Sequence, residues 1–500
     1  MNEQQRLVHK AVGSLKWSAM MEIVSRTAQP VVVIVLAKLL VPEDFGIVGT
    51  AMIVISFSRM FLDAGLGKAL VQTNLVAGNA ANVVFWTNIT LGGLIYVVIF
   101  VSAPALAGFF NSSASGPVIR VLGLQLIILS LTSVQEFLFI RNMGFRDLFW
   151  AKLAMAAMPG LFSIPLASFG FGVWALVAGT LVGSFVNMLI LWSKSPWRPS
   201  FSYDLAIARQ LFRFGFWIVL EGLGIWLIGW GDQLLVGRFL SVAELGVYRV
   251  GWYISTVLFG LTFNPLLPVM YSTFSRLQED REELKRMFHK IVRIMITFIL
   301  PIAVGVPLIA PELTDMVFGD KWEGLGFVLA FLTLLGGAGA VVAANPELYR
   351  SVGRPDVNTK VLVFTLAFYL PAYLIAVQYG LTTFVVVRTL LAFFALPVHV
   401  FFVVRIFGFS PVYLWRDGRK PINAGILMLL AVFCLKKTMY YVEFPSSELL
   451  KVLALVLVGA ATYSVVLWYS DKEFCRSVVS LFQRAIRGTK GPLSPAEAAK

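Results

Sequence analysis

Charged residues are scarce in this chain. Asp, Glu, Lys and Arg make up 14% of its 500 residues, whereas hydrophobic residues make up 58%. Soluble globular domains carry about 25% charged residues. The composition therefore excludes a soluble globule and indicates a membrane protein without a sizeable domain outside the bilayer. A transporter, a channel and a membrane-embedded enzyme are the classes that remain.

Cysteine and the common catalytic motifs are also nearly missing. Cys434 and Cys475 are the only cysteines. One lies in an apolar stretch and the other in the C-terminal tail, so we expect no structural disulfide. The sequence has no metal-ligand spacing and no Walker A, HExxH or GxSxG motif. We therefore expect no metal, no cofactor and no enzymatic activity.

Long apolar stretches fill the chain instead. A bilayer core about 30 Å thick needs about 20 apolar residues per helix. The stretches are continuous, without the alternation of membrane barrels, which favours an all-α polytopic fold. We predict about fourteen spans, at 17–38, 46–62, 82–104, 118–139, 150–168, 173–192, 215–235, 245–268, 291–310, 323–344, 361–378, 382–404, 422–442 and 449–469.

The net charge of +14 is unevenly distributed. If the N-terminus is cytoplasmic, the cytoplasmic segments hold 30 of the 41 lysines and arginines. This distribution follows the positive-inside rule. The positive charge therefore indicates membrane topology and not a nucleic-acid partner. Both termini are then cytoplasmic, which requires an even number of spans.

The two halves of the chain resemble each other. Aligned pairs are 37–48 with 237–248, 102–110 with 309–318, and 141–148 with 350–357. Their offsets of 200, 207 and 209 rise slowly, as small insertions between duplicated halves would produce. Each half then holds six spans. Because six is even, both halves have the same orientation, which is a parallel repeat found in transporters.

This repeat divides the chain into five predicted parts. Residues 1–14 form a cytoplasmic N-terminus, 15–200 an N-lobe and 201–410 a C-lobe. Residues 411–470 add two helices outside the repeat, and 471–500 form a cytoplasmic tail. The apolar residues of the tail recur on one helical face, which predicts an amphipathic helix at the membrane surface.

Several charged residues fall inside the predicted spans, where they normally face a cavity or a partner. Arg26 lies near the middle of the first span, one turn after Glu22. The two form either a buried ion pair that fixes helix packing or a basic group facing a cavity. Arg59, Arg249 and Arg388 lie in spans 2, 8 and 12. Arg59 can equally extend to the membrane interface.

Arginines around one wet cavity would favour an anionic ligand, because the planar guanidinium pairs with phosphate through two hydrogen bonds. We predict that Arg26, Arg59, Arg249 and Arg388 bind an anionic ligand. The candidates for coupling to a cation or proton are Glu22, Glu221 and Asp232. The energy source, either such coupling or the membrane potential, stays open.

Residues 40–72, LVPEDFGIVGTAMIVISFSRMFLDAGLGKALVQ, resemble the opening signature of Wzx-type oligosaccharide flippases, especially those of lipopolysaccharide, capsule and exopolysaccharide export. The similarity continues through GFRDLFWAKL (144–153), LLVGRFLSVAELGVYRVG (234–251) and FGDKW (318–322). The resemblance implies the multidrug, oligosaccharidyl-lipid and polysaccharide (MOP) exporter superfamily. It also implies two six-helix lobes around a central cavity, often followed by two more helices.

The resemblance further implies a function. The expected substrate is an undecaprenyl-pyrophosphate-linked oligosaccharide, moved by alternating access from the inner to the outer leaflet of the bacterial inner membrane. Expected partners are the lipid bilayer, a polysaccharide polymerase and glycosyltransferases. In related lipid II flippases, basic residues of helices 1, 2 and 8 line the cavity, and Arg26, Arg59 and Arg249 lie in those helices.

Three alternatives remain at this point. A cation-coupled multidrug exporter of the same superfamily would depend mainly on acidic cavity residues. A membrane-embedded polysaccharide polymerase or ligase usually carries a large outer loop with catalytic residues, which the sequence lacks. A purely structural subunit of an export complex would keep its function without Arg26.

Overall fold

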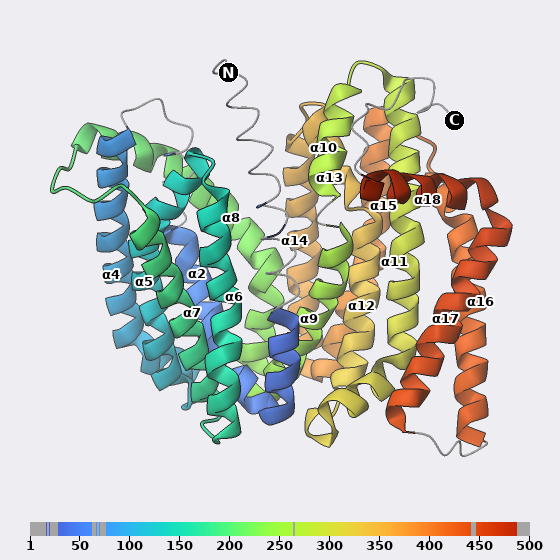
Figure 1. Cartoon of the computed structure of the whole chain (residues 1–500), viewed down its shortest axis with the longest axis horizontal. Coiled ribbons are helices and arrows are strands. Elements are labelled where there is room, and N and C mark those ends of the chain that lie inside the picture. The colour runs from blue at the N-terminus through green and yellow to red at the C-terminus, as the bar shows by residue number, and fades with distance from the viewer. Residues whose placement is uncertain are drawn as a thin grey trace.

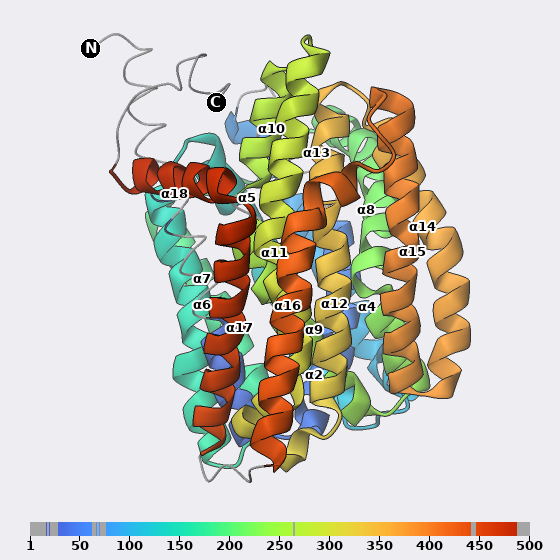
Figure 2. The ribbon, with the colours of Figure 1, turned by 90° about the vertical axis from the view of Figure 1, so that its right-hand side faces the viewer.

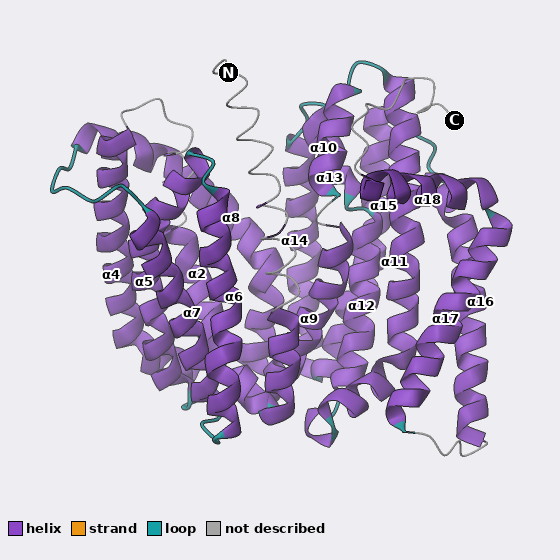
Figure 3. Cartoon of the chain, in the orientation of Figure 1, coloured by secondary structure: helices purple, strands orange, loops and turns teal. Residues whose placement is uncertain are grey.

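The computed structural model describes residues 29–62, 77–263, 266–441 and 447–487, together with Trp17, Met20, Gly67 and Leu70. Within these residues all regular secondary structure is helical, and loops and turns join the helices (Figure 3). Eleven of the described helices are long and apolar enough to cross a membrane. The expected all-α polytopic fold is therefore confirmed.

The described helices form two bundles and an appendage. The first bundle comprises the short helix Gln29–Leu39, α2 (Pro42–Leu62), α4 (Ala77–Phe109), α5 (Ser115–Arg141), α6 (Phe145–Ser168) and α7 (Val173–Lys194). The second comprises α8 (Leu205–Phe239), α9 (Val242–Phe263), α10 (Leu267–Arg276), α11 (Arg281–Phe318), α12 (Leu325–Val341), α13 (Ala344–Ser351), α14 (Asp356–Ala376) and α15 (Leu381–Phe407). The appendage comprises α16 (Tyr413–Tyr441), α17 (Glu448–Ser470) and α18 (Lys472–Arg487).

The bundles stand side by side (Figure 1). Helix α8 joins them, because it packs against α2 and α4 of the first bundle and against α9 and α14 of the second. Helices α16 and α17 pack on α11, away from the first bundle. Helix α18 lies roughly at right angles to the long helices, across their ends (Figure 2).

The predicted spans agree with the helices to within several residues at most ends. The largest difference is at α11, which runs from 281 to 318, whereas the sequence predicts 291–310. The charged segment before this span continues the same helix, and the Asp280 carboxylate accepts a hydrogen bond from the Glu283 amide at 3.0 Å. Such a cap stabilises the first turn of a helix.

The number of fourteen spans stays a prediction. Helices α8 and α9 occupy the positions of the predicted spans 215–235 and 245–268. Of the predicted span 17–38, the structure describes the part from Gln29 onward and two single residues before it.

The aligned segments 37–48 and 237–248 begin equivalent helices. The Asp44 carboxylate accepts a hydrogen bond from the Val41 amide at 3.3 Å, at the start of α2. The Glu244 carboxylate accepts one from the Ser241 amide at 3.0 Å, at the start of α9. An acid in the first turn of a helix also interacts favourably with the helix dipole. The two helices pack against each other, so the repeat places its matching segments at the contact between the bundles.

Candidate functional site

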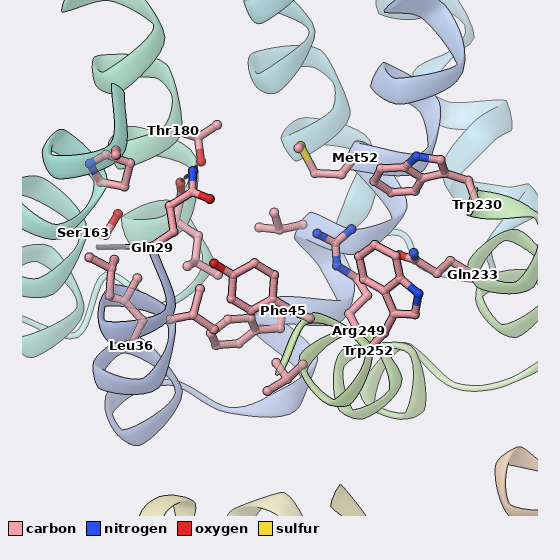
Figure 4. A pocket seen from close by; sticks show the side chains of 18 residues that line it. Gln29, Leu36, Phe45, Met52, Ser163, Thr180, Trp230, Gln233, Arg249 and Trp252 are labelled. Atoms are coloured by element: carbon pink, nitrogen blue, oxygen red, sulfur yellow. Dashed lines mark hydrogen bonds between the residues drawn. The ribbon is translucent and has the colours of Figure 1, made fainter. Parts of the chain in front are cut away.

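A central cavity of about 270 Å³ lies between the two bundles. Its walls come from the helix Gln29–Leu39, α2, α6 and α7 of the first bundle and from α8 and α9 of the second (Figure 4). The lining is mostly apolar and aromatic, with a few polar side chains. Such a composition is typical of ligand sites, where a small number of polar groups orient the ligand.

Arg249 is the one charged side chain among the described residues that line this cavity. It comes from α9, and its Nη1 donates a hydrogen bond to the Gly49 carbonyl oxygen of α2 at 3.3 Å. Its guanidinium carbon lies 5.9 Å from the centre of the Trp230 ring. No carboxylate among the described residues forms an ion pair with it. The described lining therefore carries one positive charge and no acid.

Gly49 makes room for this arginine. A Cβ atom on Gly49 would lie 2.6 Å from Cδ of Arg249. The absence of a side chain lets the arginine cross the surface of α2 and reach the cavity. A residue of the first bundle thus positions a residue of the second.

Polar side chains face Arg249 from several helices. Figure 4 shows Gln29, Ser163 and Thr180 of the first bundle grouped on one side of the cavity, opposite Arg249. Gln233 of α8 lies beside the arginine; its side chain is 1% exposed, and its Nε2 has no hydrogen-bond partner in the described part of the chain. A buried amide donor without a partner is costly. The cavity therefore offers both a positive charge and an unused donor.

Arg59 lies elsewhere. It lines a second cavity, of about 350 Å³, inside the first bundle between α2, α5, α6 and α7. We call this the side cavity. It also contains the ion pair of Lys152 with Glu136, whose Nζ and Oε1 atoms are 2.7 Å apart.

Arg388 and Asp232 form a buried ion pair, at 2.6 Å between Nη2 and Oδ2. The Tyr248 hydroxyl donates a hydrogen bond to the same Asp232 oxygen at 2.6 Å and accepts one from Arg388. The sequence assigned Arg388 to substrate binding and Asp232 to ion coupling. The structure brings the two together, and each supplies the other's partner.

The remaining predicted site residues are Glu221, Arg26 and Glu22, and none of them is among the described lining of either cavity. Glu221 is exposed on the surface of α8. Arg26 and Glu22 lie outside the described residues.

Sequence reasoning missed Gln29, Trp230, Gln233 and Trp252 as cavity residues. Trp252 follows Arg249 by three residues, so it shares a helical face with the arginine, and this spacing could have indicated it. Trp230 and Gln233 have the same spacing on α8. Neither residue is charged, so neither stands out from the sequence of an apolar helix as a cavity residue.

A family model described as a polysaccharide biosynthesis protein matches residues 35–325, more than half of the chain. The chain belongs to this family. It is 24% identical to the lipopolysaccharide biosynthesis protein WzxC of Escherichia coli (strain K12), over 78% of this chain and 81% of that protein. It is 23% identical to the succinoglycan biosynthesis transport protein ExoT of Rhizobium meliloti (strain 1021), over 97% of each.

Solved structures show the same fold. The inward closed conformation of the lipid II flippase MurJ matches with a TM-score of 0.72 at 13% identity, covering 94% of this chain and all of that one. An inward-facing multidrug resistance MATE family transporter of the MOP superfamily matches with a TM-score of 0.58 at 17% identity, covering 79% and 99%. The expected Wzx-type family and MOP fold are confirmed. The chain is a multi-pass membrane protein of the polysaccharide biosynthesis family.

Proposed function

We propose that this protein flips a polyprenyl-pyrophosphate-linked oligosaccharide, with undecaprenyl as the lipid, from the inner to the outer leaflet of the bacterial cytoplasmic membrane. Its family and the names of its relatives in lipopolysaccharide and succinoglycan synthesis support a lipid-linked glycan as the substrate. The two bundles would rock around the central cavity and open it to each side in turn. Both termini are cytoplasmic in this proposal, and glycosyltransferases and a polymerase act before and after the flip.

Arg249 carries this proposal. It places one positive charge, with no described acid beside it, in a cavity that both bundles enclose. A guanidinium and the Gln233 amide can bind the pyrophosphate, while Trp230 and Trp252 can pack against sugar rings. A cation-coupled drug exporter would instead need an acidic lining, and the described lining offers an arginine.

The alternating motion explains why the site must bind moderately. A headgroup held by many cations would not be released on the other side. One arginine from the second bundle, hydrogen-bonded to the backbone of the first, is sensitive to the separation of the bundles. Arg26 remains a proposed second contact.

A sidedness assay in reconstituted vesicles tests this function. Labelled lipid-linked oligosaccharide is followed by its exposure to an impermeant glycosidase, with wild type, Arg249→Gln and the control Arg120→Gln. Arg120 lies on α5, donates a hydrogen bond to the Phe100 carbonyl and lines neither cavity. We expect transfer by wild type and Arg120→Gln and at least a tenfold loss in Arg249→Gln, since a lost charge-assisted hydrogen bond contributes about 1.5–3 kcal/mol. Equal transfer by all three would reject Arg249, and no transfer by folded wild type would reject the flippase.

A further inference from the structure

The side cavity is polar although it lies within a bundle of membrane helices. Besides the charged side chains, it is lined by the amides of Gln125 and Asn187 and the hydroxyls of Thr132, Ser133 and Ser184. Polar groups inside membrane helices are costly unless they face partners or water, and they commonly mark pathways for polar substrates. The proposed pyrophosphate site does not use any of these residues.

Two amide oxygens in this cavity have no described partner. Gln125 is 7% exposed and Asn187 is 6% exposed, and both line the cavity. Their Oε1 and Oδ1 atoms accept no hydrogen bond from the described residues. The Gln125 Nε2 donates to Ser184 Oγ at 3.0 Å, and this hydroxyl donates in turn to the Thr180 carbonyl oxygen at 2.9 Å, so Ser184 gives no hydrogen bond to Gln125 Oε1. Buried acceptors without a donor are unfavourable, so the cavity suits a ligand rich in donor hydroxyls.

The charge of the cavity favours an anion. Lys152 and Glu136 are 2.7 Å apart and neutralise each other. Arg59 forms no ion pair with any described residue, so the described lining of the cavity carries one excess positive charge. A bare cation is disfavoured there. A carboxylate can pair with the Arg59 guanidinium through two hydrogen bonds.

Neighbouring positions of the same helices line the two cavities. Met52 lines the central cavity and Arg59 the side cavity, and seven residues of α2 span about 10 Å. On α7, Thr180 lines the first and Ser184 the second, one turn apart. A headgroup whose pyrophosphate lies at Arg249 can therefore extend its sugars along α2 and α7 to Arg59.

From this arrangement we propose that the side cavity is a subsite for a sugar residue that bears a carboxylate. Arg59 pairs with the carboxylate, and the Gln125 and Asn187 oxygens accept hydrogen bonds from the sugar hydroxyls. The subsite makes the protein selective for acidic over neutral repeat units. This inference rests on the proposed function for its role in transport, but not for the binding itself.

Paired substrates test the selectivity. Two lipid-linked oligosaccharides are prepared that differ only in that the carboxylate of one sugar is reduced to a primary alcohol. In the vesicle assay, we expect wild type to move the acidic form about tenfold faster, which corresponds to one charge-assisted hydrogen bond. Arg59→Gln abolishes the difference, Arg59→Lys keeps part of it, and Arg120→Gln behaves as wild type.

A binding measurement separates this inference from the flippase itself. A soluble tetrasaccharide containing glucuronic acid and its carboxyl-reduced form are titrated into the purified full-length protein. We expect tighter binding of the acidic form, lost in Arg59→Gln, and weaker binding of both forms by Asn187→Ala. Wild type that binds the acidic sugar selectively but moves no lipid-linked substrate would reject the flippase and keep the subsite.

Three outcomes would overturn the subsite. Wild type that moves and binds both forms equally has no acidic selectivity. If Arg59→Gln retains the wild-type selectivity, Arg59 does not bind the carboxylate. Arg59→Gln that weakens transport of both forms by the same factor assigns Arg59 to the pyrophosphate, which both substrates share.

Discussion

Gly46 of α2 and Gly246 of α9 occupy equivalent positions in the two halves of the chain, and each packs against the other's helix. A Cβ atom on Gly46 would lie 1.8 Å from the carbonyl oxygen of Val242. A Cβ atom on Gly246 would lie 1.9 Å from the carbonyl oxygen of Pro42. The aligned residues therefore make reciprocal contacts where the two bundles meet. Only glycine allows two helix backbones to approach this closely.

Replacing Gly46 by alanine should separate the bundles at this crossing. The obstacle is backbone, which cannot rotate away, so we expect a loss of about 1–3 kcal/mol from overpacking. Thermal unfolding in detergent would show a lower Tm, and Gly246→Ala should behave in the same way. Gly93→Ala is the matched control, because nothing lies within 4 Å of a Cβ there. An unchanged Tm for both crossing variants would show that the helices are not in contact.

Gly49→Ala should act on the site without this loss of stability. The nearest obstacle is the flexible Arg249 side chain, whose Cδ lies 2.6 Å from the added carbon. The arginine can move aside, but its guanidinium then leaves its place in the cavity. We expect transport in the sidedness assay to fall towards that of Arg249→Gln while Tm stays near wild type. Full transport by Gly49→Ala would mean that the position of Arg249 does not matter.

The Asp232–Arg388 pair should behave as a structural unit. Asp232→Asn leaves a buried guanidinium without its counter-ion, and breaking a buried pair in this way costs about 3–5 kcal/mol. Arg388→Gln should cost a similar amount. The double variant should lose less than the sum of the two, because neither charge is then left alone. Tyr248→Phe removes one hydrogen bond and should cost about 1 kcal/mol.

The free energies of unfolding of the four variants would measure the coupling between Asp232 and Arg388. Transport assays would distinguish this structural role of Asp232 from a role in ion coupling. If Asp232→Asn unfolds like wild type but transports poorly, Asp232 couples transport to an ion. That result would contradict a structural role for the pair.

Asp471 should fasten α18 to the bundle. Its carboxylate accepts hydrogen bonds from Arg293 and, at 3.0 Å, from Lys420, and Arg293 also lies 4.5 Å from the Phe474 ring centre. Cys475 follows on the same helix, and burial raises the pKa of its thiol. A raised pKa leaves less of the reactive thiolate at neutral pH. We therefore expect wild type to react slowly with maleimide at this cysteine.

Asp471→Asn, in a Cys434→Ser background, should release the start of α18 and speed this labelling. The pH profile of labelling should also move towards lower pH, because an exposed thiol has a lower pKa. Glu473→Gln is the matched control, since Glu473 is exposed on the same turn and none of its described contacts is an ion pair. Equal labelling rates for wild type and Asp471→Asn would show that the ion pairs do not hold the helix.

Much of the fold follows from the sequence. The bilayer sets the length of each apolar stretch, and every backbone hydrogen bond must be made within the helix, so the helices could be located without tertiary information. The prediction of 173–192, for example, agrees closely with α7 at Val173–Lys194. The alignment of 37–48 with 237–248 likewise indicated equivalent segments, and in the structure each contains the start of a helix.

The site depended on tertiary structure. Arg59, Arg249 and Arg388 look alike in the sequence, since each is one basic residue in an apolar helix. Packing places Arg249 in the central cavity, Arg59 in the side cavity and Arg388 against Asp232. The sequence by itself determined that charges enter the membrane and on which helices they lie. The rotation of each helix and the approach of residues far apart in the chain decided which charge meets a cavity and which meets a partner, because both are set by the packing of helices within and between the bundles.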